Sequence, residues 1–161
     1  LGVVIETRDG ECVARLSVPD VVPDNNVAEY RALHFGLDVL AARTPPYSRV
    51  GVLVDHDELA ANVNATMLDL DAPCVESPHR TEIPPATTNH WRGIQARIRG
   101  FHEIRVARIE SDVNPAHPLA NAPEEYAHVN TEREQCLRPD PVTAVGERVP
   151  PPSRSDRPAD D

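Results

Sequence analysis

One segment near the N-terminus constrains the fold of this chain more than any other, the run DNNVAEYRALHFGL at residues 24–37. Asp24 and Asn25 are residue types whose side chains accept hydrogen bonds from the free amides of a first helical turn. Apolar residues then recur at helical spacing as far as Leu40. Because two prolines follow Thr44, the sequence predicts a helix over residues 25–43.

The two sides of this predicted helix differ in chemistry. At about 100° per residue, Arg31, His34 and Asp38 share a narrow polar face, while Glu29 lies on the opposite side with Leu33. A carboxylate on the core side of a helix must be paired, solvated in a cleft or bound to a metal. The alternative is that Glu29 only interacts with the positive end of the helix dipole.

The rest of the chain predicts an α/β order of strand, strand, helix, strand, helix, loop, helix, strand, helix. We expect strands over residues 1–6, 12–18, 50–54 and 103–109, and further helices over residues 57–67, 89–100 and 114–129. Residues 50–54 carry no polar side chain, which is typical of a central strand covered on both faces. We expect Asp57 to cap the next helix, residues 69–88 to form a surface loop and Trp91 to lie in the core.

Composition adds a statement about the environment. The net charge is -10, and all 16 basic residues are Arg, without one Lys. An acidic, Lys-free surface with few aromatic residues is the pattern of a halophilic protein, and we expect a haloarchaeal, cytoplasmic monomer. Acidic proteins repel phosphates, but in molar salt the Debye length falls to about 3 Å. Nucleic-acid binding therefore stays open, and Arg92, Arg97 and Arg99 form either a phosphate-contacting patch or a solvated face.

Several classes of protein are disfavoured. No apolar run approaches the roughly 20 residues of a membrane span, and no signal peptide is visible. The three cysteines lack the spacing of a zinc finger, so a structural zinc site is not expected.

The pattern Asn-Asn-x-Ala-Glu-Tyr-x-Ala-Leu-x-x-Gly-Leu at residues 25–37 closely resembles the first helix of bacterial and archaeal type 1 ribonucleases H. The resemblance extends over about residues 1–127 and implies a mixed sheet flanked by helices. We expect this domain to span residues 1–130 and residues 131–161 to form a disordered tail rich in Pro, Asp and Arg. The family's opening strand, with its catalytic aspartate, has no counterpart here. Because the chain starts at Leu1 inside an apolar run, we expect a fragment or a start trimmed within the fold.

The resemblance also implies a chemistry, the hydrolysis of the RNA strand in RNA–DNA hybrids by four carboxylates that hold two divalent ions, Mg²⁺ or Mn²⁺. In this family the glutamate matching Glu29 is a metal ligand, and the asparagines matching Asn25 and Asn26 contact nucleic acid. The third ligand is an aspartate followed by Ser-x-Leu. Counting back from the next leucine selects His56, whereas counting from the end of the strand selects Asp55.

The fourth family carboxylate lies at the start of the last helix, where this chain has His117 in a run beginning at Asn114. An imidazole-rich site of Glu29, His56 and His117 would suit Mn²⁺ or Zn²⁺ better than Mg²⁺, or would mark altered or lost catalysis. Two functions follow as hypotheses. The first is a metal-dependent nuclease, a hydrolase acting on RNA–DNA hybrids. The alternative is a non-catalytic nucleic-acid-binding or interaction module on the same fold, and an in-frame strand bearing Asp-Gly upstream of Leu1 would favour the enzyme.

Overall fold

The computed structural model describes residues 1–22 and 24–121. Within them the elements follow the predicted order. The strands are β1 (Gly2–Glu6), β2 (Cys12–Ser17), β3 (Arg49–Val54) and β4 (Glu103–Arg108); the helices are α1 (Asn25–Arg43), α2 (Asp57–Asp71), α3 (Thr88–Ile98) and α4 (His117–Asn121), with short 3-10 turns at Pro85–Thr87 and Ser111–Val113. The predicted tail lies outside the described residues, as does the second half of the helix expected to reach residue 129.

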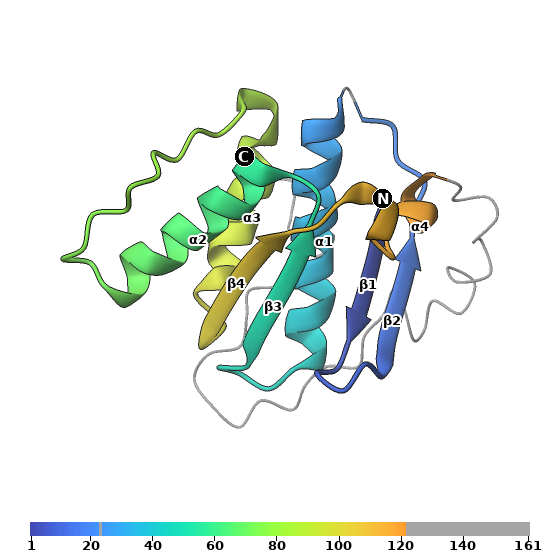
Figure 1. Ribbon diagram of the computed structural model, residues 1–161, viewed down its shortest axis with the longest axis horizontal. Helices are drawn as coiled ribbons and strands as arrows, with labels where there is room; N and C mark the ends of the chain where they lie inside the picture. The colour runs from blue at the N-terminus through green and yellow to red at the C-terminus, as the bar shows by residue number, and fades with distance from the viewer. Residues whose placement is uncertain (23, 122–161) are drawn as a thin grey trace, which may run out of the picture.

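The described strands form two pairs rather than one continuous sheet. β1 pairs with β2 antiparallel, through a turn in which Gly10 has φ 82°, and β3 pairs with β4 in parallel. In Figure 1 the two pairs stand apart, with α1 visible between β1 and β3, and in the described part of the chain each strand is hydrogen-bonded only to its own partner. This is the mixed α/β architecture expected from the sequence.

Helices α1, α2 and α3 lie behind the strands in Figure 1, and all three contribute apolar residues to the main core. The main core contains Tyr30, Leu59, Trp91 and Ile104, which are all 6% exposed or less, so Trp91 is a core residue as predicted. A smaller cluster joins β1 and β2 to α1 through Leu16 and neighbouring apolar residues. The helices therefore cover one face of both strand pairs.

The opposite face of β3 differs from the sequence prediction. Leu53 is 59% exposed and Gly51 is also exposed, so among the described residues β3 is covered on one face only. Successive residues of a strand point to opposite faces, and only Val50, Val52 and Val54 point to the helices. The prediction of a strand covered on both faces is wrong for this part of the structure.

The short helix α4 lies on the other face of the β1–β2 pair. A Cβ atom on Gly2 would stand 2.2 Å from the Ala116 carbonyl oxygen, so only glycine permits this approach. Ser17 donates a hydrogen bond of 2.6 Å to the Leu119 carbonyl, and both residues are fully buried. These contacts fix the start of α4 near the ends of β1 and β2.

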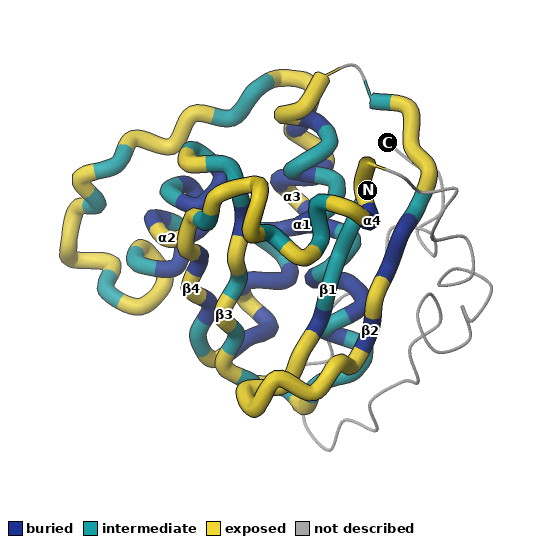
Figure 2. Tube along the Cα trace, turned by 45° about the vertical axis from the view of Figure 1, so that its right-hand side comes forward, coloured by how far each residue is buried: buried dark blue, intermediate teal, exposed yellow. Residues whose placement is uncertain are grey.

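The helix α2 is longer than predicted, since it continues through Asp71. The loop that follows it is mostly exposed, as Figure 2 shows. It is nevertheless attached to the core, because the buried Asn62 amide donates to the Tyr30 hydroxyl at 2.9 Å and to the Glu82 carbonyl at 3.0 Å. None of the described helices combines the length and the apolar character that crossing a membrane requires.

Candidate metal and nucleic-acid site

Two of the predicted site residues meet where α1 begins and β3 ends. Glu29 lies about one turn into α1, and Asp55 directly follows β3, near enough for its carboxyl group to act on Glu29. Burial, followed by the charge and hydrogen bond of Asp55, raises the pKa of Glu29 from 4.5 to about 7. At this pKa, Glu29 exchanges between its protonated and its charged form near neutral pH.

His117, the first residue of α4, approaches the same pair. Its Nδ1 atom lies 3.9 Å from Asp55 Oδ2, and its Nε2 atom lies 2.7 Å from the Asn121 side-chain nitrogen. The Asp55 side chain is 13% exposed, whereas that of His117 is 43% exposed. The structure therefore brings Glu29, Asp55 and His117 together at one place, with Asp55 in the middle.

His56 has a different place from the one that its position in the sequence suggested. Its Nδ1 atom accepts the Leu59 amide at 3.1 Å, and its Nε2 atom contacts Asn26 Oδ1 at 2.7 Å. Both ring nitrogens are thus engaged, one in capping α2 and one in joining α2 to α1. The prediction that Asp57 caps this helix is wrong, because the imidazole of His56 reaches the free amide first and Asp57 is already helical.

The start of α1 agrees with its prediction. The Asp24 side chain accepts the Val27 amide at 3.0 Å and so caps the helix. Asn25 and Asn26 follow in the first turn and are exposed. The two amides therefore lie on the surface about one turn before Glu29.

The opposite face of α1 is buried rather than solvated, which the sequence reasoning missed. His34 and Asp38 are each 8% exposed, and the Asp38 carboxylate accepts Arg97 Nε at 2.5 Å. Arg97 is 4% exposed and therefore belongs neither to a phosphate-contacting patch nor to a solvated face, although Arg92 and Arg99 are exposed. The sequence feature that could have indicated this burial is the pair His34 and Asp38, two ionisable residues four positions apart on one helix.

Comparison with known proteins supports the fold. A solved structure with a TM-score of 0.55 is the N-terminal RNase H domain of a Mycobacterium tuberculosis protein, determined as a fusion with maltose-binding protein; it is 24% identical, and the match covers 81% of this chain and 84% of that one. No protein-family profile and no curated protein matches the chain. The likeness shows an RNase H-like fold.

Proposed function

We propose that this chain, which has an RNase H-like fold, engages RNA–DNA hybrids and hydrolyses their RNA strand with a divalent cation held by Glu29 and Asp55. The observation that carries the proposal is the carboxylate pair itself, partly buried and close together at the end of β3. Two adjacent carboxylates disfavour each other's charged form unless a cation lies between them. A site built in this way has a stronger affinity for a divalent ion than either carboxylate alone.

The donor set fits one such ion. Mg²⁺ binds through one or two carboxylates, keeps several waters and takes further oxygens from substrate phosphates, and Mn²⁺ suits the same donors. Glu29 and Asp55 supply that minimum, and the proton that the raised pKa leaves on Glu29 near neutral pH would be released on binding. Residues 1–22 and 24–121 contain no group of three His, Cys, Asp or Glu side chains arranged to hold a metal. The second ion that the resemblance implies therefore finds no donors of its own among them.

Each residue of the site has a separate part in this proposal. A bound divalent ion would activate water and neutralise charge on a phosphate. His117 places an imidazole nitrogen toward Asp55 and helps to orient that carboxylate. The exposed amides of Asn25 and Asn26 would contact the nucleic-acid strand, since phosphate and sugar oxygens are common partners of such side chains.

A second function is favoured by a specific observation. The described residues bring two carboxylates to the site instead of four, and both nitrogens of His56 are occupied. A non-catalytic module that binds nucleic acid through Asn25 and Asn26 would need no more than this. Fold alone does not distinguish the two functions, because function depends on the site.

The test is hybrid cleavage and hybrid binding measured on the same proteins. With Mg²⁺ or Mn²⁺, in dilute and in molar KCl, we expect the wild type to cut the RNA strand and Glu29→Gln to lose activity by on the order of a thousandfold. The substitution keeps the size of the side chain and removes the charge that holds the ion. Calorimetric titration with Mn²⁺ should show weaker binding to Glu29→Gln and to Asp55→Asn.

The matched control is Glu6→Gln, the same substitution at an exposed carboxylate outside the site. Cleavage that survives Glu29→Gln unchanged would contradict the role of this residue. A wild type that binds hybrid but shows no metal-dependent cleavage would establish the non-catalytic function. In that case Asn25→Ala should still weaken hybrid binding while Glu29→Gln leaves it unaltered.

A further inference from the structure

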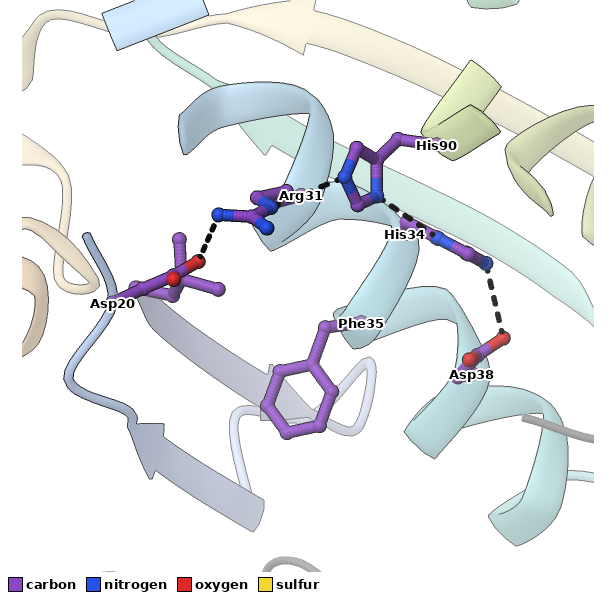
Figure 3. A pocket seen from close by; sticks show the side chains of 7 residues that line it. Asp20, Arg31, His34, Phe35, Asp38 and His90 are labelled. Carbon is purple, nitrogen blue, oxygen red and sulfur yellow. Dashed lines mark hydrogen bonds and ion pairs between the residues drawn. The ribbon is translucent and has the colours of Figure 1, made fainter. Parts of the chain in front are cut away.

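A second cluster of ionisable side chains lies on the side of α1 away from Glu29. Asp20, Arg31, His34, Asp38 and His90 line a small pocket between α1, α3 and the loop after β2, together with Leu1 and Phe35. Figure 3 shows the side chains joined in the order Asp20, Arg31, His90, His34 and Asp38, from the loop through α1 to α3 and back to α1. None of them belongs to the proposed metal and nucleic-acid site.

The contacts in this cluster run from one residue to the next. Arg31 Nη1 donates to Asp20 Oδ2 at 2.9 Å, and Arg31 Nε donates to His90 Nε2 at 3.1 Å. The Nδ1 atoms of His90 and His34 are 3.4 Å apart. His34 Nε2 then faces Asp38 Oδ1 at 3.8 Å.

Burial makes these contacts costly to lose. His34 and His90 are 8% and 6% exposed. The His34 ring lies directly against α3, since a Cβ atom on Gly93 would stand 2.0 Å from its Nε2 atom. Water therefore has little access to the two rings, and a buried donor that loses its acceptor is not easily compensated.

Only one arrangement of protons makes both ring contacts into hydrogen bonds. The Arg31 guanidinium is always protonated and can only donate, so His90 Nε2 must be the unprotonated nitrogen. His90 must then carry its proton on Nδ1 and donate it to His34 Nδ1. His34 consequently carries its proton on Nε2, directed toward the Asp38 carboxylate.

We propose that this cluster is a proton-sensitive latch between α1 and α3, closed when both histidines are neutral and opened by the uptake of one proton. One extra proton on either ring gives a donor facing a donor, at the Arg31–His90 contact or at the His90–His34 contact. A proton on His90 would also put a second positive charge beside Arg31. A proton on His34 would be attracted by Asp38, but Arg97 already neutralises that carboxylate.

Within residues 1–22 and 24–121, the charged side chains that face the cluster are Arg31 and Asp38 of α1, Arg97 of α3 and Asp20 of the preceding loop. An ordinary imidazole, with its reference pKa of about 6.5, changes its charge between mildly acidic and neutral pH. Below neutrality the latched state binds fewer protons than an opened one. The latch should therefore weaken as the pH falls.

The direct test is the protonation state of each ring, read from long-range ¹H–¹⁵N spectra of the full chain at about pH 7.5. We expect His90 to carry its proton on Nδ1 and His34 to carry its proton on Nε2. A proton on His90 Nε2, or a charged ring at this pH, would overturn the proposal. Zn²⁺ added as a probe should leave both signals in place, and loss of the His90 Nδ1 proton on Zn²⁺ binding would show a metal site instead.

The functional test removes the Arg31 guanidinium, the group that can only donate to His90. Arg31→Met should free His90 to take a proton at Nε2 without a facing donor. From about pH 7.5 to about pH 5.5, the melting temperature of the wild type should fall by about 3–5 °C more than that of the variant, a size typical of one buried hydrogen bond. Apart from Arg31 and its ion pair with Asp20, the two proteins carry the same titratable groups, and the histidines are the ones that titrate with an ordinary pKa inside this pH range.

Arg92→Met is the matched control, because Arg92 is an exposed arginine of α3 outside the cluster. The melting temperature of Arg92→Met should depend on pH in the same way as that of the wild type. Equal pH dependence of the wild type and Arg31→Met would refute the latch. Should Arg31→Met fail to fold, the ring protonation states of the wild type still decide the question.

Discussion

The Glu29 carboxyl must satisfy two opposed conditions at one position. It lies on the core side of α1, where burial disfavours a negative charge, and it contacts Asp55, a second carboxyl group that disfavours that charge further. Near neutral pH the residue therefore alternates between a protonated form that suits the isolated fold and a charged form that suits a bound cation. Stability and ion binding thus place different demands on Glu29.

This conflict predicts how stability varies with pH when divalent ions are absent. The pKa of Glu29 is about 7 in the folded state and near 4.5 in the unfolded state, so between these values the folded state binds more protons. The free energy of unfolding should then fall as the pH rises through this window. At about pH 8 in EDTA, Glu29→Gln should be more stable than the wild type by ~1 kcal/mol, a value discounted for solvent screening.

The measurement is urea unfolding of both proteins at several pH values. The histidine latch contributes a slope of the opposite sign, so the difference between wild type and variant is the quantity to compare. Glu6→Gln should show no such difference. A Glu29→Gln variant that is less stable than the wild type at about pH 8 would contradict the raised pKa.

At the level of elements, α2 closes the outer edge of β4 with a single side chain. The Asn64 amide nitrogen donates to the Val106 carbonyl at 2.8 Å, and its oxygen accepts the Val106 amide at 2.9 Å. This is the pair of bonds that a neighbouring strand would supply. Unpaired strand edges promote association with other chains, so Asn64 also protects this edge.

Asn64→Ala should therefore destabilise the fold by about 1–2 kcal/mol, because it leaves two backbone groups of β4 without their partners. Asn64→Asp should be destabilised as well, since it keeps the acceptor but sets an anion against the Val106 carbonyl. Asp69→Ala, at an exposed position of the same helix, is the control. Hydrogen exchange of the Val106 amide gives the decisive reading, and unchanged protection in Asn64→Ala would refute the pairing.

Local signals were sufficient to predict most elements but not their surroundings. The bounds of α1 follow from its cap at Asp24 and from the prolines beyond Thr44, all within a few residues of the helix. The burial of His34 and Asp38 depends on α3, since Arg97 lies 59 positions from Asp38. The contact between Glu29 and Asp55 was anticipated by the family pattern, whereas the cap at His56 depends on a ring orientation that no spacing encodes.

For the whole molecule, α1 connects the two regions that carry chemistry. One side of it bears Glu29, next to Asp55, and the other bears His34 and Asp38, next to α3. A movement of α3 relative to α1 would change the packing of α1, the helix that positions Glu29. Because α1 also contacts β1 through Gly36 and Val3, it is the element on which both strand pairs depend.

The last prediction concerns the net charge of -10. Charges of one sign repel one another most strongly at low ionic strength, and this repulsion favours the expanded unfolded chain. Added KCl should therefore raise the melting temperature steadily from millimolar to molar concentration, as the Debye length falls from about 30 Å to about 3 Å. Sucrose is the control, because it strengthens burial without screening charge. A melting temperature that stays flat or falls in KCl would refute adaptation to high salt, and binding of a polyanionic nucleic acid by so acidic a chain would then lack the screening it requires.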